Sequence, residues 1–124
     1  MMLATNWGVY EICQRHAKFI AKGDNRDMEV RARDKLHLRN LRDVCPRLGP
    51  TVDLSGDADF PYRAFITREG LALLLAAVAD EIDYVQFKKD AKPKLHTLLT
   101  RFWTAWLTAY PKGSHYTKVP ARRR

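Results

Sequence analysis

The sequence predicts an α+β protein in which a small antiparallel sheet of about three strands is packed on one face by helices, in the order β-β-α-β-α-α. Three observations indicate this class. Residues 28–33 alternate apolar and charged side chains, which is the pattern of a strand with one buried face. Residues 71–82 place leucine, valine and isoleucine at helical spacing. Clusters of glycine, proline and aspartate separate such segments, as is typical of turns.

The first two strands are predicted to form a hairpin with a long connection. Residues 7–13 are rich in aromatic and β-branched side chains, which favour a strand, and residues 28–33 supply the second strand. Gly23, Asp24 and Asn25 lie between them and tolerate the positive φ that turns require. The connection also carries four basic side chains, namely Arg15, Lys18, Lys22 and Arg26.

The third predicted strand lies between two capped helices. Asp34 is a suitable N-cap for a helix that runs to about Val44, because its carboxylate can accept an otherwise unpaired backbone N–H. Residues 62–66 follow Pro61, which suits the start of a strand because no ladder donor is needed there. Thr67 is the corresponding N-cap of the second helix, which contains the leucine-rich stripe.

The C-terminal part is predicted to be helical until about Tyr110. A short segment around Tyr84 and Phe87 precedes Pro93, and the last helix runs from Lys94 onward. This last helix has an apolar face at helical spacing. The face consists of Leu95, Leu98, Leu99, Phe102 and Trp106, and Trp103 and Leu107 widen it.

One domain is expected over residues 1–110, followed by a basic, flexible tail over residues 111–124, where apolar periodicity stops. A chain of 124 residues is long enough to bury a core without disulfides or metal. It contains 22 Lys and Arg against 14 Asp and Glu, so its net charge is +8. Five of these positive charges belong to the tail, which has no acid, and the domain carries the remaining three. The basicity is therefore mainly a property of the tail.

The cysteines and the apolar runs indicate the cellular compartment in which the protein is expected. Cys13 and Cys45 are only two cysteines in a chain of this size, which is typical of free thiols in a reducing compartment. The longest apolar run, residues 71–79, is too short to span a bilayer, so no membrane partner is expected. No segment has the charged and apolar regions of a signal peptide. We therefore expect a cytoplasmic protein.

The first candidate binding surface consists of Arg31, Arg33 and Arg63, which alternate with core residues on two predicted strands. If these strands are neighbours, the three guanidinium groups share a sheet face that suits phosphates or carboxylates. The alternative is a solvated face on which the arginines pair with acids. The acids in question are Glu29, Asp59 and Asp83.

The hairpin connection and the tail form a second candidate surface. Its basic residues are Arg15, Lys18, Lys22 and Arg26 in the connection and Arg122, Arg123 and Arg124 at the end of the tail. Each cation that reaches a phosphate releases counterions, which adds affinity without base preference. The alternative is that these charges serve solubility at a loop and at a disordered end.

The aromatic side chains of the last helix form a third candidate, for a protein partner. They are more numerous than one apolar stripe can bury, so we expect Trp103 or Tyr110 to be exposed. An exposed aromatic near Arg101 is a typical anchor of a protein interface. The alternative is that these aromatics pack under the tail or across a sheet edge.

No catalytic or metal-binding pattern is present in the sequence. The four histidines and two cysteines are spread over separate elements, and none of their spacings is that of a zinc site. There is no glycine-rich phosphate loop, and no serine or cysteine has a recognisable histidine partner. We therefore expect no enzyme activity, no catalytic residues, no metal and no cofactor.

Several blocks resemble those of a family of small, mostly uncharacterised proteins encoded by bacteria and their phages. The family motifs are Y-G-x-[FY], V-R-A-R…H-L, D-[YF]-x-[YF]-R, N-F-K and V-W. The blocks that match them here are Trp7-Gly8-Val9-Tyr10, Val30-Arg31-Ala32-Arg33 with His37 and Leu38, Asp59-Phe60-Pro61-Tyr62-Arg63, Phe87-Lys88 and Phe102-Trp103. Gln86 replaces the asparagine of N-F-K, and the basic tail departs from the family. The resemblance implies this fold and a bacterial host cell, and it implies no catalytic residues.

The function expected from these features is binding without catalysis. We expect a phage-type protein that acts on nucleic acid or a nucleoprotein complex through its basic surface. The alternative is a phage-borne inhibitor of a host defence complex, such as an anti-CRISPR or similar anti-defence factor, that acts by protein–protein contact with aromatic and arginine anchors. The oligomeric state is left open.

Overall fold

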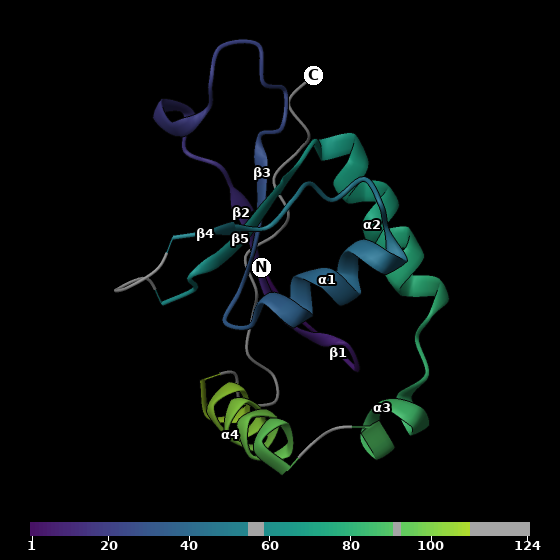
Figure 1. Ribbon diagram of the computed structural model, residues 1–124. Coiled ribbons are helices and arrows are strands. Elements are labelled where there is room, and N and C mark those ends of the chain that lie inside the picture. The colour runs from purple at the N-terminus through teal and green to yellow at the C-terminus, as the bar shows by residue number, and fades with distance from the viewer. Residues whose placement is uncertain (55–58, 91–92, 110–124) are drawn as a thin grey trace, which may run out of the picture. The chain divides into compact units, whose positions relative to one another are not determined.

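A computed structural model of the chain describes residues 1–54, 59–90 and 93–109 (Figure 1). The predicted tail, residues 111–124, lies outside the described residues. The chain divides into two compact units, Met1–Asp90 and Ala91–Arg124.

The first unit is built on one antiparallel sheet with the strand order β1-β2-β3-β5-β4. Its strands are β1 (Met2–Thr5), β2 (Gly8–Gln14), β3 (Met28–Ala32), β4 (Val52–Asp53) and β5 (Tyr62–Ile66). Four helical segments accompany the sheet, namely the 3₁₀ turn η1 (Ala17–Phe19), α1 (Lys35–Val44), α2 (Arg68–Asp80) and α3 (Tyr84–Asp90). The predicted α+β class is confirmed.

The prediction of about three strands was an undercount, because the sheet has five. The two missed strands are its edges. β1 is only four residues long, and β4 has two residues, which is too short to show any alternation. Both segments are strands because their backbone groups form hydrogen bonds with a neighbouring strand. β1 pairs with β2, and β4 pairs with β5. Pairing of this kind leaves little trace in local sequence.

The predicted helix starts are confirmed by their capping hydrogen bonds. The Asp34 carboxylate accepts from the backbone N–H of Leu36 at 2.8 Å, at the start of α1. The Thr67 hydroxyl accepts from the N–H of Gly70 at 2.9 Å, at the start of α2. Each cap satisfies a donor that the first helical turn cannot pair, which explains why both helices begin where they do.

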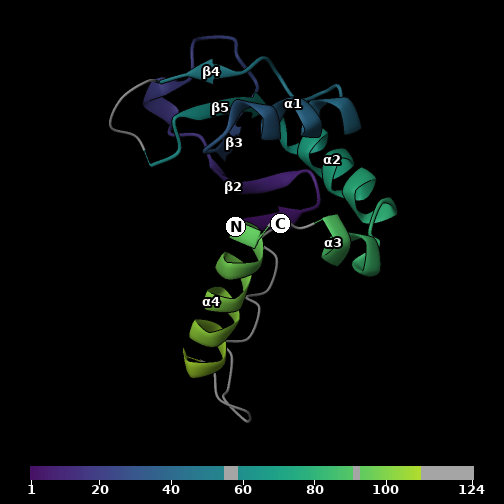
Figure 2. The ribbon, with the colours of Figure 1, turned by 60° about the horizontal axis from the view of Figure 1, so that its bottom comes forward.

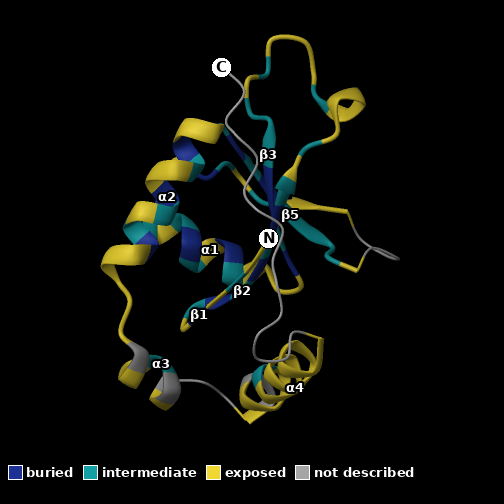
Figure 3. Ribbon diagram, turned by 180° about the vertical axis from the view of Figure 1, so that it is seen from behind, coloured by how far each residue is buried: buried dark blue, intermediate teal, exposed yellow. Residues whose placement is uncertain are grey.

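The core lies between the sheet and α1, with α2 beside it. Leu38 and Leu41 of α1 are fully buried against the sheet, and Leu74 and Val78 face inward from α2. Figure 3 shows the buried side of these helices turned toward the strands, with the exposed side facing out. The sheet contributes Tyr10, Ile12, Val30, Ala32, Ala64 and Ile66.

The register of the sheet separates its two faces. Val30 is paired with Ala64, and both point into the core. Because side chains alternate along a strand, their neighbours Glu29 and Arg31 project from the opposite face. Arg31 is paired with Arg63, so these two arginines lie next to each other on that face.

The second unit contains the helix α4 (Pro93–Ala109), which Figure 2 shows along much of its length. Four threonines of this helix donate their hydroxyl groups to the backbone oxygen four residues earlier, at 2.8–3.1 Å. They are Thr97, Thr100, Thr104 and Thr108. Such bonds from a threonine hydroxyl to the preceding turn are common inside helices.

Candidate functional site

The structure brings two of the three predicted sheet arginines together, but it pairs them with an acid. Glu29 is only 4% exposed and lies on the same sheet face as Arg31 and Arg63. Arg63 donates from Nη1 to Oε1 of Glu29 at 2.9 Å, and Arg31 donates from Nη2 to Oε2 at 3.3 Å. One buried carboxylate therefore bridges two guanidinium groups and offsets half of their charge.

Other contacts engage this face further. Arg31 also lies 3.8 Å from the Glu11 carboxylate. Arg33 donates to the backbone oxygen of Asp59 at 2.7 Å rather than to its carboxylate. Asp83, the third acid considered, instead accepts a backbone hydrogen bond at the start of α3. The arginine face is thus a paired network, and little of its charge is left for an anion.

Two of the predicted cations of the hairpin connection share one acid within it, which offsets half of their charge. Asp24 accepts from Nη1 of Arg15 at 2.9 Å and from Nε and Nη2 of Arg26 at 2.9 and 3.0 Å. The hydrogen bonds from Arg26, followed by that from Arg15, hold the pKa of the Asp24 carboxyl well below its usual range. The Arg15 guanidinium also lies over the Phe65 ring, 3.7 Å from its centroid.

Lys18 and Lys22 differ from these arginines, because both are exposed and neither has a carboxylate partner among the described residues. Lys18 belongs to η1, and its Nζ lies 5.0 Å from the centroid of the exposed Phe19 ring. The hairpin connection therefore keeps two of its four predicted cations available to a partner.

Replacing Asp24 with asparagine should loosen the hairpin connection. A neutral amide cannot balance Arg15 and Arg26, so amide hydrogen exchange over residues 16–24 should become roughly tenfold faster. Asp27→Asn is the matched control, because Asp27 pairs with the exposed Arg68 outside this network. Equal acceleration in the two variants would contradict the role assigned to Asp24.

The same contact predicts the pH dependence of the connection. The folded-state pKa of Asp24 is lowered, so its stabilising effect is complete above the pKa of an unfolded aspartate, about 3.9. The effect is lost only as the pH falls further, through the folded-state pKa. Protection factors in the wild-type connection should therefore be the same at pH 5 and pH 4.5, and a loss over that range would contradict the assignment.

A cationic cleft that the sequence reasoning missed lies between α1 and the β4 edge of the sheet. It has a volume of about 310 Å³ and is lined by Lys35, Arg39, Arg42, Thr51, Asp53 and Tyr62. Its three cations occupy positions i, i+4 and i+7 of α1, so they follow one face of the helix. The residues of α1 that pack on the sheet, Leu38 and Leu41, lie on an adjacent side of the helix.

Arg42 is fixed in this cleft by the loop that precedes β4. Its Nη2 donates to the backbone oxygen of Gly49 at 2.7 Å and to the Thr51 hydroxyl at 2.9 Å. These acceptors are neutral, so they orient the guanidinium without cancelling its charge. Neither Lys35 nor Arg39 forms an ion pair with any other described residue. We name this site the α1 cleft.

The chemistry of the α1 cleft suits a phosphate or another oxyanion. Three cations face one carboxylate, that of Asp53, and the hydroxyl groups of Thr51 and Tyr62 add donors. The signal was present in the sequence as basic residues at helical spacing, on the polar side of a predicted helix. It was missed because β4, which forms the opposite wall, leaves no pattern in the sequence.

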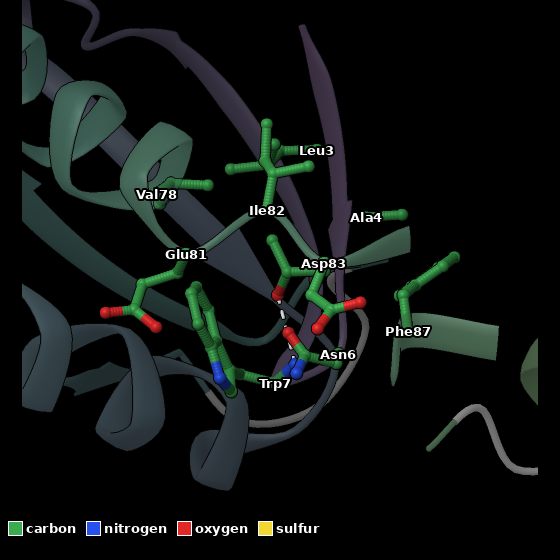
Figure 4. A pocket seen from close by; sticks show the side chains of 10 residues that line it. Leu3, Ala4, Asn6, Trp7, Val78, Glu81, Ile82, Asp83 and Phe87 are labelled. Atoms are coloured by element: carbon green, nitrogen blue, oxygen red, sulfur yellow. Dashed lines mark hydrogen bonds between the residues drawn. The ribbon is translucent and has the colours of Figure 1, made fainter. Parts of the chain in front are cut away.

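A second, apolar cleft of about 280 Å³ lies at the end of α2. Figure 4 shows its side chains, with Leu3 and Ile82 close together and Trp7 beneath them. Trp7 is held there by a hydrogen bond from its backbone N–H to the Thr5 hydroxyl, at 3.1 Å. The carboxylates of Glu81 and Asp83 lie at its rim, together with the amide of Asn6. This cleft suits an apolar side chain with a basic neighbour.

The cysteines are free and show no sign of activation. Cys45 is buried, and burial raises the pKa of the Cys13 thiol, with Arg31 acting in the opposite direction. In the described part of the chain, no three histidine, cysteine or acidic side chains lie close enough to hold a metal ion. None of the helices over those residues is long and apolar enough to cross a membrane.

Of the two aromatics predicted as interface anchors, Trp103 is described and is 50% exposed. Its ring lies 5.1 Å from that of Trp106, which in turn stacks with Phe102 at 6.4 Å. Tyr110 lies outside the described residues, as do Arg122, Arg123 and Arg124. The aromatic group of α4 is therefore a continuous surface feature within its own unit.

Comparisons with protein-family models, with curated proteins and with solved structures found no match for this chain. The resemblance to small proteins of bacteria and their phages stays a prediction.

Proposed function

We propose that this protein binds nucleic acid, alone or within a nucleoprotein complex, without catalysing a reaction. The observation that supports this proposal best is the α1 cleft. Lys35, Arg39 and Arg42 line one cavity, and no ion pair among the described residues neutralises them. The predicted basic surfaces offer less, because four of their five described arginines pair with acids.

The spacing of the three cations fits a phosphate backbone. Lys35 and Arg42 are seven positions apart, which corresponds to about 10 Å along the axis of α1. In duplex DNA one strand advances by about 3.4 Å per nucleotide along the helix axis. The α1 cleft can therefore follow a backbone over about three nucleotides, with contacts to phosphates rather than to bases.

The distribution of charge gives the C-terminal region a part in this binding. Residues 1–90 contain 14 basic and 14 acidic side chains, so the first unit has no net charge. The whole excess of +8 belongs to residues 91–124, which contain no acid. We propose that this region attracts the nucleic acid over a distance and that the α1 cleft holds it.

Charge reversal in the α1 cleft tests the proposal. The Lys35→Glu/Arg39→Glu variant should bind labelled single-stranded and duplex DNA roughly tenfold or more weakly than the wild type. Two lost phosphate contacts should also make the plot of log affinity against log salt shallower by about 1.8. Fluorescence anisotropy over a range of salt concentrations measures both quantities.

Lys18→Glu/Lys22→Glu is the matched control, because it changes the net charge by the same amount on the hairpin connection. Its affinity for DNA should fall less than that of the Lys35→Glu/Arg39→Glu variant. The slope of its salt plot should stay closer to the wild-type slope. Equal losses in the two variants would assign binding to net charge alone and contradict the role of the α1 cleft. No measurable binding by the wild-type protein at low salt would refute the proposed function.

The apolar cleft favours a second candidate function, inhibition of a host defence complex by protein–protein contact. Its lining includes Ile82, which is 76% exposed, together with Trp7 and Phe87. Large apolar side chains at an open cleft are typical anchors for a protein partner. Ile82→Arg should abolish co-purification of a nuclease-resistant protein from the host. Recovery of nucleic acid alone would count against this candidate.

A further inference from the structure

About half of the surface of α4 is apolar, and within its own unit no other described element covers it. Two adjacent rows run along the helix, one of Leu98, Phe102 and Trp106 and one of Leu99, Trp103 and Leu107. Five of these six side chains are between 40% and 63% exposed. In aqueous solution, apolar rows of this length are normally covered by another apolar surface, because exposing them to water is unfavourable.

The other half of α4 is polar but carries little charge. Thr100, Thr104 and Thr108 form the next row, and each donates its hydroxyl to a backbone oxygen of the same helix. Arg101 is the one charged residue between Leu98 and Ala109. A polar face whose hydroxyls are already bonded loses little when it leaves bulk water.

The charge of the surrounding region identifies the kind of partner. Residues 91–124 contain eight Lys and Arg and no Asp or Glu. A second copy of α4 would bring like charges together and supply no acid to pair with them. The charge therefore favours an anionic partner, which must also cover two rows of leucine and aromatic side chains.

A lipid bilayer with anionic head groups meets both requirements. Nucleic acid offers phosphates and base faces for stacking, but it has no apolar medium for Leu98 and Leu107. Helices with Trp, Phe and Leu on one face and basic residues nearby lie in the bilayer interface, where acyl chains take the apolar face. Nearby Lys and Arg are attracted to the anionic head groups.

We propose that α4 lies in the surface of an anionic membrane, parallel to it, with its leucine and aromatic rows among the acyl chains. The sequence led us to expect no membrane partner because no apolar run can span a bilayer. A helix in the interface does not need that length. The proposal concerns the second unit and does not rest on nucleic-acid binding by the α1 cleft.

The test uses the full-length protein and vesicles of phosphatidylcholine, with or without phosphatidylglycerol. Wild-type protein should co-sediment with the anionic vesicles at least roughly tenfold more strongly than with the neutral ones. Trp7→Phe leaves Trp103 and Trp106 as the only tryptophans. Their emission should then shift to the blue on binding and be quenched by brominated acyl chains.

Two matched variants separate insertion from charge attraction. Leu98→Glu places an acid in an apolar row, and Thr104→Glu places the same acid in the polar half. Leu98→Glu should lose most of the vesicle binding, whereas Thr104→Glu should keep most of it. Circular dichroism establishes that both variants retain their helix content.

Three results would overturn the proposal. The first is the absence of co-sedimentation with anionic vesicles. The second is binding that salt reverses without any blue shift, which would leave only charge attraction by the basic region. The third is a blue shift without lipid that accompanies dimer formation, which would show that a second copy covers the apolar rows.

Discussion

Glu29→Gln should lower the free energy of unfolding of the first unit by about 3 kcal/mol. Glutamine keeps the shape of the side chain but removes the negative charge that bridges Arg31 and Arg63 at 3.3 and 2.9 Å. The two guanidinium groups, with side chains only 26% and 21% exposed, would then lie side by side without an anion between them. Urea denaturation measures the change, with Trp7 fluorescence as the probe in a protein whose Trp103 and Trp106 are replaced by phenylalanine.

Glu11→Gln is the control for this prediction. Glu11 lies on the neighbouring strand β2, but its side chain is 30% exposed and 3.8 Å from Arg31. An ion pair with that exposure and distance contributes less, so we expect a loss below about 1 kcal/mol. A loss at Glu29 no larger than the loss at Glu11 would show that the bridge has no special role in stability.

Gly8→Ala should destabilise the first unit by about 2–3 kcal/mol, because the backbone at Gly8 is covered by a histidine ring. A Cβ at this position would lie 2.5 Å from Cγ and 2.6 Å from Cβ of His37, and 2.8 Å from the Tyr10 hydroxyl oxygen. His37 cannot move away freely, since its backbone oxygen accepts from that hydroxyl at 2.7 Å and its Nδ1 accepts from the Val9 N–H at 3.4 Å. The same denaturation experiment measures the loss.

A double-mutant cycle tests the cause. His37→Gly removes both His37 atoms that a Cβ at Gly8 would meet, so Gly8→Ala should cost much less in that background than in the wild type. We expect a coupling free energy of about 1–2 kcal/mol between the two changes. Additive effects would show that the cost of Gly8→Ala comes from the strand backbone rather than from the ring.

Local sequence signals predicted the helices that begin at a capping residue and the strand whose side chains alternate clearly. Asp34 and Thr67 cap α1 and α2 in the structure, and the alternation of residues 28–33 corresponds to β3. The missed strands β1 and β4 depend on pairing with β2 and β5. Their existence is a property of the tertiary structure, which a local pattern does not contain.

The candidate sites show a similar division. The sequence places Arg31 and Arg63 on one face, but it does not decide whether Glu29 or an external anion would pair with them. The register decides this, because it puts Glu29 beside both arginines and excludes water from its carboxylate. Likewise, the sequence did not single out Lys35 and Arg39, because β4, which forms the second wall of their cleft, leaves no local pattern.

The strand order has a consequence for the way in which the first unit folds. β1, β2 and β3 pair with the strands next to them in sequence, whereas the β3–β5 pairs join residues as distant as Met28 and Ile66. Closing that longer loop costs more entropy before any contact repays it, so we expect the three N-terminal strands to meet first and β5 to join them later. Destabilising changes confined to the β3–β5 ladder should then act mainly on the rate of unfolding and leave the rate of folding nearly unchanged.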